Sequence, residues 1–484
     1  MTNVIPGLSK DGKTVELDVS NIIQLVFSRS PRVTASREAM VSAQHGLDEF
    51  RRNLSRFEPF IEARGDVSEF PNREGAFGHG AEAVIGVQKE TFEGAVLRTE
   101  AGGAFSRFEF GDFDTARRIE DGNGALVRAR LEAPFFGSRK RQNRVIQQAF
   151  QESTARKARL DYLDDYGDYV DDAISYYNLA VYYRALMNAY EDYIADLNTL
   201  LRDERLRAAD RPRVETVRAS AESTYRSYRT EHEEAIALLL AETGLGGGTE
   251  YALKIDEYKL SPFAKAAENP SEFDELLERA RENDPTFRVL NDAIRDTELQ
   301  RQQAISGKYD VTTFLEGTMF PLGSESFDDR LDGWTLGGGV SFRLNDARVL
   351  DRTRLKAESE IRQFRARIRS SELQMRRRIR IETRGLLDNH RNREELIRNR
   401  EQNGTVYEQR RGEYFRGEVN VDQLLSARSQ LLSSATSVEA NHYNTRSRVR
   451  RIMGATGEFY DRVGLGMTQR ANSKGSNVTG SNGT

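Results

Sequence analysis

The amino-acid sequence predicts an α+β fold in which long coiled-coil helices alternate with short β-strands in a tandem structural repeat. Two long segments, 138–211 and 346–416, contain no proline and carry apolar residues at heptad spacing, which is typical of coiled-coil helices. A segment of alternating apolar and polar residues precedes each of them, which indicates strands. Because this order of elements occurs twice, we predict an internal repeat.

The two long segments are predicted to be the first arms of helical hairpins that span 138–244 and 346–456. At 1.5 Å per residue each first arm would approach about 100 Å, too long for the core of an ordinary domain. Pro212 and Gly417 mark the turns, because proline and glycine interrupt an α-helix. The heptad positions are Leu163, Tyr166, Val170, Ala173, Tyr177 and Ala180 in the first hairpin and Ala357, Ile361, Phe364, Ile368, Ser371 and Met375 in the second.

The strand segments before the hairpins have one apolar face. Apolar residues alternate with Arg128, Arg130 and Glu132 over residues 125–133, and with small or polar residues over 334–344. Strands of about 9 to 11 residues can cross a membrane when tilted. A half-exposed sheet in a water-soluble protein would show the same alternation, so the pattern alone leaves both possibilities open.

The tandem repeat divides the chain into four parts. Helices are expected to begin at Pro31 and Pro285, after the capping residues Ser30 and Asp284. We predict an N-terminal extension, two repeats that each contain a helix, strands and a helical hairpin, and a disordered tail rich in Ser, Asn and Gly. The predicted bounds are 1–14, 15–250 with strands in 57–134, 251–460 with strands in 309–345, and 461–484.

The first repeat is longer than the second. The span from Pro31 to Pro134 exceeds the matching span from Pro285 to Arg343 by 45 residues. Strand-like runs at 81–91 and 95–110 lie within this surplus, on either side of a Glu-Gly turn. They predict either an extended hairpin or further strands.

Composition excludes several classes of protein. The 72 basic and 76 acidic residues give a formal net charge of −4, which argues against binding to nucleic acid. There is no cysteine, so disulfides and thiolate chemistry are excluded. No apolar run approaches the roughly 18 residues of a membrane-spanning helix. Residues 1–13 show no export signal, so we expect either a cytoplasmic chain or a processed mature form.

No pattern in the sequence indicates catalysis, a cofactor or a metal. The five histidines show no pair at metal-ligand spacing. The glycine-rich run from Gly244 to Gly248 follows a helix instead of a strand and lacks the Lys-Ser/Thr end of a phosphate-binding loop. We therefore expect that the chain is not an enzyme.

Three segments, in their order along the chain, carry a resemblance to a known family. They are the run from Val15 through Ser30-Pro31 into Arg32, the segment Leu131-Glu-Ala-Pro-Phe-Phe-Gly-Ser-Arg139, and the segment Tyr414-Phe-Arg-Gly417-Glu-Val-Asn-Val-Asp-Gln-Leu-Leu-Ser-Ala427-Arg-Ser-Gln-Leu431. They resemble the N-terminal helix entry, the strand-to-helix hinge and the inter-helix turn of the TolC family of outer-membrane efflux ducts. The resemblance covers about residues 15–460.

The resemblance implies an outer-membrane channel that serves as an exit duct for efflux or type I secretion. It implies a homotrimer with a transmembrane β-barrel, in contact with outer-membrane lipid, and an α-helical barrel in the periplasm. A periplasmic adaptor (membrane fusion) protein and an inner-membrane transporter are the implied partners. Closure by several copies also follows from physics, because an open sheet edge in lipid leaves backbone groups unpaired. With four core strands per chain, a trimer would close a twelve-stranded barrel.

By the same resemblance, the turns at 208–215 and 414–423 form the periplasmic tip. Tyr414, Arg416 and Glu215 are candidates to latch the closed entrance. Gly417 and Val419 are candidates to contact the adaptor.

The chain departs from the family pattern at both turns. In the second turn Gln423 and Ser426 occupy the positions of two aspartates, and Asp422 lies one residue before the first of them. In the first turn Ala209 aligns with the usual glycine, Glu215 aligns with the usual aspartate, and Pro212 enters the bend. An acidic ring at the entrance is therefore not expected.

Two further expectations concern the strands and the rival function. A lipid-facing surface tolerates few charges, so Arg128, Arg130, Glu132 and Arg343 are expected to point into a wet lumen. The alternative is a soluble coiled-coil scaffold protein with small β inserts, which the low mean hydropathy favours.

Overall fold

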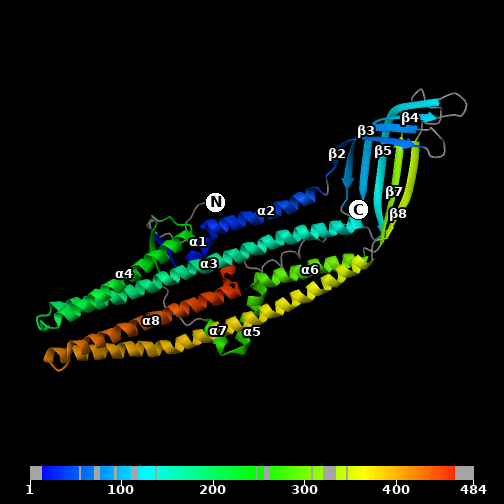
Figure 1. The fold of residues 1–484 in the computed structure, drawn as a ribbon. Helices are drawn as coiled ribbons and strands as arrows, with labels where there is room; N and C mark the ends of the chain where they lie inside the picture. Colours follow the sequence, from blue (N-terminus) through cyan, green and yellow to red (C-terminus); the bar gives the residue numbers. More distant parts are fainter. Residues whose placement is uncertain are drawn as a thin grey trace, which may run out of the picture. The chain divides into compact units, whose positions relative to one another are not determined.

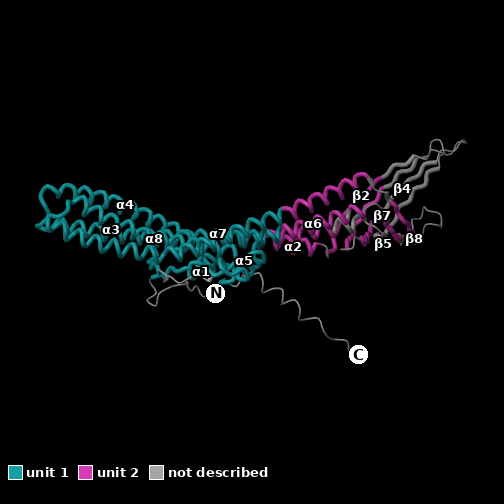
Figure 2. Tube along the Cα trace, turned by 90° about the horizontal axis from the view of Figure 1, so that it is seen from below, with its two compact units in different colours: residues 1–40, 158–289, 367–484 teal, residues 41–157, 290–366 magenta. Residues whose placement is uncertain are grey.

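The computed structural model describes residues 14–53, 56–69, 77–91, 95–110, 118–136, 139–246, 248–254, 262–306, 309–319, 334–344 and 347–463. The chain forms two compact units (Figure 2). Unit 1 combines residues 1–40, 158–289 and 367–484, and unit 2 combines residues 41–157 and 290–366. This grouping follows spatial contacts, and the division into sequence repeats at 15–250 and 251–460 stays a prediction.

The helical part consists of two hairpins of long helices and several shorter helices (Figure 1). The first hairpin is α3 (Arg139–Arg202) with α4 (Arg211–Glu242), and the second is α7 (Ala347–Arg416) with α8 (Val421–Thr456). With 64 and 70 residues, α3 and α7 each measure about 100 Å along their axes. The shorter helices are α1 (Val19–Arg29), α2 (Pro31–Asn53), the 3₁₀ helix η1 (Pro262–Ala267), α5 (Pro270–Asn283), α6 (Pro285–Ser306) and α9 (Glu458–Asp461).

The helix ends follow local capping chemistry. The Asp18 carboxylate accepts a hydrogen bond from the Asn21 N–H at 2.8 Å and caps α1. At α6, the Asp284 carboxylate accepts from the Thr286 N–H at 2.7 Å. Asn420 and Gln423 form a reciprocal capping box at the start of α8. These caps fix where α1, α6 and α8 begin.

Unit 2 contains an antiparallel six-stranded sheet in the order β2-β3-β4-β5-β7-β8. The strands are β2 (Glu58–Glu69), β3 (Phe77–Glu90), β4 (Val96–Phe110), β5 (Arg118–Phe136), β7 (Tyr309–Met319) and β8 (Trp334–Leu344). The surplus of the first repeat therefore supplies further strands, β3 and β4. The expectation of four core strands per chain is wrong, because this hairpin is inserted between β2 and β5.

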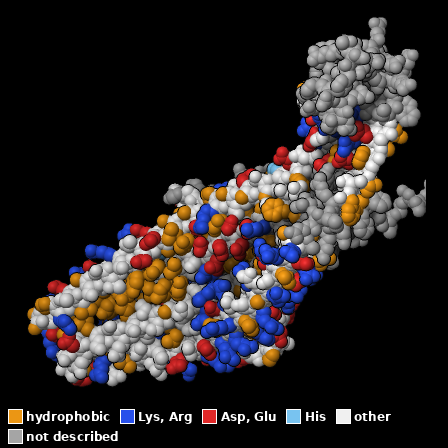
Figure 3. Space-filling model, turned by 45° about the vertical axis from the view of Figure 1, so that its right-hand side comes forward, with side chains coloured by type: hydrophobic (Ala, Val, Ile, Leu, Met, Phe, Trp, Pro, Cys, Tyr) orange, Lys and Arg blue, Asp and Glu red, His pale blue; other side chains and the backbone are white. Residues whose placement is uncertain are grey.

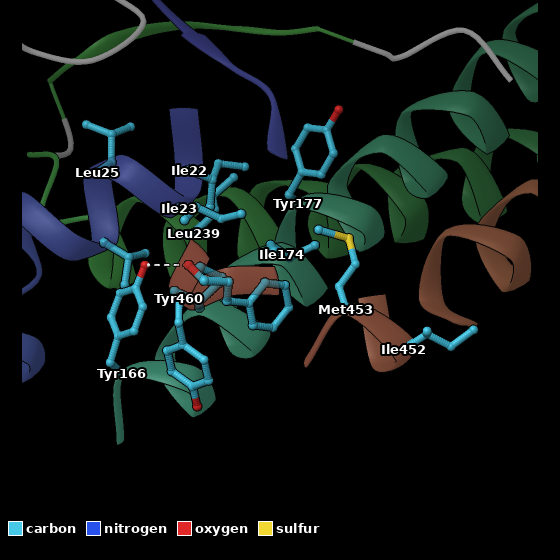
Figure 4. Close-up of a cluster of buried hydrophobic side chains, with 14 of the residues drawn as sticks. Ile22, Ile23, Leu25, Tyr166, Ile174, Tyr177, Leu239, Ile452, Met453 and Tyr460 are labelled. Carbon is cyan, nitrogen blue, oxygen red and sulfur yellow. Dashed lines mark hydrogen bonds between the residues drawn. The ribbon is translucent and has the colours of Figure 1, made fainter. Parts of the chain in front are cut away.

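Unit 1 has a hydrophobic core around the heptad face of α3 (Figure 4). Tyr166, Val170 and Ala173 are fully buried, which confirms that the heptad pattern marks a buried helix face. Ile22 and Ile23 of α1 belong to the same core. A two-stranded parallel sheet of β1 (Thr14–Leu17) and β6 (Glu250–Leu253) borders it, and the Tyr166 hydroxyl donates to the Phe459 carbonyl at 3.5 Å (dashed line in Figure 4).

The surface of the helical part is divided by residue type. Figure 3 shows a band of hydrophobic side chains beside a region rich in Lys and Arg. Exposed arginines cluster on α7, where Arg376 pairs with Asp274 of α5 at 3.4 Å. A hydrophobic band on the outside of one chain is typical of a surface that packs against another copy.

Candidate functional site

The sheet of unit 2 has an apolar face that no other part of the described chain covers. Leu131 on β5 is 44% exposed and Val340 on β8 is 69% exposed. The strand register places Leu131 opposite Leu97 on one side and Leu315 on the other. The large exposed apolar side chains of this face come from all six strands: Ile61, Ile85, Val87, Leu97, Val127, Leu131, Leu315, Leu336, Val340 and Phe342.

The opposite face of the sheet carries a network of ion pairs. Glu100 on β4, whose side chain is 1% exposed, accepts hydrogen bonds from Arg98 Nε at 2.7 Å and from Arg128 Nη1 at 2.6 Å. Arg128 on β5 also reaches Glu82 on β3 at 3.2 Å, and Arg98 pairs with Glu62 on β2. Buried charges need partners and hydrogen bonds to offset the loss of water. The network therefore couples four adjacent strands, β2 to β5.

The charges predicted to face a lumen lie on this second face. Arg130 pairs with Glu132 at 2.7 Å and with Glu316 of β7 at 3.1 Å. With Arg128, they line a hollow of about 820 Å³. The backbone of Arg343 on β8 lies opposite that of Asp310 on β7. The side chain of Arg343 is not among the described parts of the structure. That these four residues line a lumen stays a prediction.

The two inter-helix turns are joined by a hydrophobic cluster in unit 1. Its buried side chains come from α3, α4, α7, α8 and the first turn: Tyr193, Leu197, Leu200, Leu206, Val214, Ala221, Tyr407, Tyr414, Val421, Leu424, Leu425 and Leu432. The cluster brings the predicted tip segments 208–215 and 414–423 together within one chain. We call the two turns and this cluster the helical tip.

Tyr414 connects the two turns of the helical tip. Its side chain is 2% exposed, and its hydroxyl donates to Asp210 Oδ2 at 2.8 Å and accepts from the Arg207 N–H at 3.5 Å. The Arg207 guanidinium also lies 5.5 Å from the centre of the Tyr414 ring. Burial and the bond to Asp210 raise the pKa of Tyr414 above that of a free tyrosine. The hydroxyl is therefore held in the protonated form that donates to Asp210 at neutral pH.

Exposed ion pairs surround this buried contact. Arg213 of α4 pairs with Asp422 of α8 at 3.0 Å, and Arg416 pairs with Glu418 of its own turn at 2.7 Å. Arg205 pairs with Asp203 and holds the pKa of that carboxyl at about 2, chiefly through their hydrogen bonds. Solvent screens pairs this exposed, so the hydrophobic cluster and Tyr414 dominate the contact between the turns.

The structure places the other predicted tip residues as follows. Ala209, Pro212 and Glu215 are exposed, Val419 is half-buried against the hydrophobic cluster, and Gln423 completes the capping box of α8. Their roles in latching or docking stay predictions.

Two contacts of the helical tip were not predicted from the sequence. Asp210 stands directly before α4, where an aspartate usually caps the helix, but its backbone is helical and its side chain makes no capping bond; its Oδ2 accepts from Tyr414 instead. Arg428 of α8 is buried, pairs with Asp196 at 2.6 Å and lies 5.0 Å from the centre of the Tyr193 ring. The unused capping position was the one available signal for Asp210, and nothing in the sequence singles out Arg428.

Replacing Tyr414 with phenylalanine is expected to lower the thermal stability of the helical tip. The ring keeps its packing, but the bond to Asp210 is lost and a carboxylate loses its donor, which costs about 1 kcal/mol. In an Asn198→Cys background, the rate at which a thiol reagent labels the cysteine, measured as the temperature rises, would report local opening of the helical tip. An Asp210→Asn variant serves as the control, because its amide oxygen still accepts from the tyrosine, and it should behave nearly as the wild type. Equal losses in both variants would assign the effect to the aspartate charge instead.

The described part of the chain contains neither a metal-binding cluster nor a membrane-spanning helix. Among the described residues there is no group of three or more His, Cys, Asp or Glu that could hold a metal ion. Within the same residues, no helix has the length and apolar character needed to cross a membrane.

Comparisons with known proteins give a consistent result for the fold. No protein-family model matches the sequence, and no curated protein matches it. Among solved structures, the outer-membrane channel OprN superposes with a TM-score of 0.64 at 12% identity, covering 91% of this chain and 89% of that chain. The outer-membrane protein VceC of Vibrio cholerae gives 0.62 at 13%, covering 91% and 96%. The CmeC outer-membrane channel of Campylobacter jejuni gives 0.60 at 11%, covering 93% and 89%.

Proposed function

We propose that this chain, which has the fold of TolC-type outer-membrane channels, is an exit duct through the bacterial outer membrane. The proteins with this fold to which it is similar are channels and not enzymes. The observation that carries the proposal is the sheet of unit 2, with an exposed apolar face across all six strands and a network of paired charges on the other face. Lipid would contact the first face, and water the second.

The barrel needs more than one chain. Within the described residues, β2 and β8 each pair with a single strand, so both edges of the sheet are open. Open edges in a hydrocarbon environment cost several kcal/mol for each unpaired backbone group. We propose that three chains close the barrel, and that the helical hairpins of the two repeats, six in a trimer, form a periplasmic tunnel that continues it. The hydrophobic band on the helices supports packing between copies.

The proposed partners are a periplasmic adaptor and an inner-membrane pump. The helical tip would meet the adaptor, with Gly417 and Val419 as contacts and with Tyr414, Arg416 and Glu215 at the entrance. Gly417 is exposed and sits at a left-handed backbone position with φ of 82°. Val419 is half-buried, so its outer surface is open to a partner.

Replacing Gly417 with alanine is expected to weaken adaptor-dependent transport. A Cβ would find only an ordinary contact with Arg207 at 3.6 Å, so the effect comes from the positive φ, which costs an L-residue about 1–2 kcal/mol. Export of a pump substrate from cells would measure it. Gly412→Ala is the matched control, because Gly412 lies inside helix α7, where alanine is favourable. Unchanged export by the Gly417 variant would remove this residue from the proposed docking surface.

Membrane fractionation with single-channel recording tests the proposal as a whole. A trimeric duct should sediment with the outer membrane, require detergent for extraction, migrate differently with and without heating, and conduct ions in a planar bilayer. The alternative, a soluble coiled-coil scaffold with small β inserts, should remain in the detergent-free supernatant as an oligomer and should not conduct. The second outcome would overturn the duct.

A further inference from the structure

The β3–β4 hairpin lies at the same level of the sheet as the strands on either side. The register aligns Ile85 of β3 with Ile61 of β2 and, through Ala101 of β4, with Val127 of β5. One row further, Val87 aligns through Thr99 with Ala129. Ile85 is 61% exposed on the apolar face. The part of the hairpin from Ile85 to Ala101 is therefore an integral part of the sheet at the height of the apolar band, and the rest continues beside β2 and the first half of β5.

The charged face is also continuous across the inserted hairpin. Glu82 of β3 pairs with both Arg64 of β2 and Arg128 of β5. Glu100 of β4 is buried between Arg98 and Arg128. If the hairpin left the sheet, Arg128 would lose both of these carboxylates. Pairing across four strands thus favours a wall in which β3 and β4 stay between β2 and β5.

The polarity of the edges fits a second copy of this chain. Five successive antiparallel pairings connect β2 to β8, so the two edge strands run in opposite directions. In a ring of copies, β8 of one chain therefore meets β2 of the next in antiparallel orientation, as in membrane barrels with an even strand number. No mismatch in direction interrupts the barrel.

We infer that β3 and β4 belong to the barrel wall, and that β2 of one chain pairs with β8 of a second copy. Three chains of six strands then close a barrel of eighteen strands, in place of the twelve expected from the sequence. This inference rests on the proposed trimeric duct. Since barrel diameter grows roughly linearly with strand number, the barrel is about half again as wide as one of twelve strands and encloses an aqueous channel.

Lipid contact of the hairpin can be measured with single tryptophans. The chain has one tryptophan, Trp334, so a Trp334→Phe background has no tryptophan fluorescence of its own. In this background Leu131→Trp reports on β5, Ile85→Trp on the inserted hairpin, and Gln88→Trp on the charged face of the same hairpin. The full-length protein is placed in lipid vesicles. Brominated phosphatidylcholine in the vesicles quenches tryptophans that contact lipid, and iodide, added separately, quenches tryptophans that contact water.

The inference expects brominated lipid to quench Leu131→Trp and Ile85→Trp to a similar extent, at least twofold more than Gln88→Trp. Quenching of Leu131→Trp without quenching of Ile85→Trp would place the hairpin outside the wall and overturn the inference alone. Absence of quenching at both positions would instead overturn the proposed membrane duct.

The width of the barrel has an independent test. A variant lacking residues 77–110 joins β2 to β5 at one end of the sheet, because β3 and β4 are antiparallel, and it leaves four strands per chain. Polymer exclusion from the barrel side of a planar bilayer then gives the size limit of the lumen. The limiting polymer radius should fall by about a third, in proportion to strand number. An unchanged limit in a variant that still inserts and conducts would contradict an eighteen-stranded wall.

Discussion

Replacing Leu131 with arginine is expected to destabilise the assembled barrel, because a cation on the lipid face costs from about 1 kcal/mol near the interface to about 4 kcal/mol at the bilayer midplane. Leu131 lies on the apolar face of β5, five residues before the end of the strand at Phe136, opposite Leu97 and Leu315. An arginine there would replace an apolar side chain by a charge that lipid cannot hydrate. Val340→Arg on β8 should show a similar loss. Denaturant unfolding of the protein in vesicles, or the fraction of heat-modifiable oligomer, would measure both.

The control for these variants is a substitution to arginine on the charged face of the sheet. Gln88 on β3 lies on the charged face, where its amide donates to Glu58 at 3.1 Å. Gln88→Arg adds a cation beside a carboxylate in a wet environment and should change stability by less than about 1 kcal/mol. If arginine is tolerated equally at Leu131 and Gln88, the apolar face does not contact lipid. If it is equally harmful at both, the loss reflects disturbance of the sheet in general.

The long helices could be predicted because their signals are local. The absence of proline over 138–211, the heptad spacing around Tyr166 and the glycine at 417 each act within a few turns of helix. The structure accordingly places Tyr166 in a buried core and ends α7 at Arg416, directly before Gly417. Helix α3 ends at Arg202, several residues before Pro212. Pro212 instead lies in the first turn of α4, where proline is tolerated because its missing N–H would have no helical partner.

The sheet could be predicted only in part because strand pairing is not local. Alternation around Leu131 and Val340 identified the strands and their apolar faces, and both residues are exposed on one face. The runs at 81–91 and 95–110 show alternation too, but alternation does not reveal a strand's neighbours. The partner of β5 on one side is β4 and on the other is β7, which lies almost 200 residues further along the chain.

The charges of the candidate site show the same limit. Period two placed Arg128, Arg130 and Glu132 on one side of the strand, and the structure confirms that they share a face. Their partners Glu82, Glu100 and Glu316 belong to other strands, so the network required the register. The sequence indicated Tyr414 because it lies at the predicted turn of the second hairpin. Its acceptor Asp210 lies in the turn of the first hairpin, and the sequence does not show that the two turns meet.

Replacing Glu100 with glutamine is expected to destabilise the sheet by about 2–3 kcal/mol. Breaking a buried ion pair by removing one partner costs about 3–5 kcal/mol, because the remaining charge is left uncompensated. The loss should be somewhat smaller here, since Arg128 keeps Glu82 and Arg98 keeps Glu62. Glutamine preserves the shape of the side chain, so the change isolates the charge. Denaturant unfolding would measure the stability, and the reversal potential of the open channel in a salt gradient would measure ion selectivity.

Glu62→Gln separates the effect of burial from that of charge. Both variants remove one negative charge from the same face, but the Glu62 side chain is 36% exposed and lies on the edge strand β2. Both should shift selectivity toward anions, because each variant removes one negative charge from this face. Glu100→Gln should lose clearly more stability than Glu62→Gln, because solvent screens the charges that pair with Glu62. Equal stability in the two variants would mean that water reaches Glu100 in the assembled barrel. A selectivity unchanged by either would mean that this face does not line the conducting path.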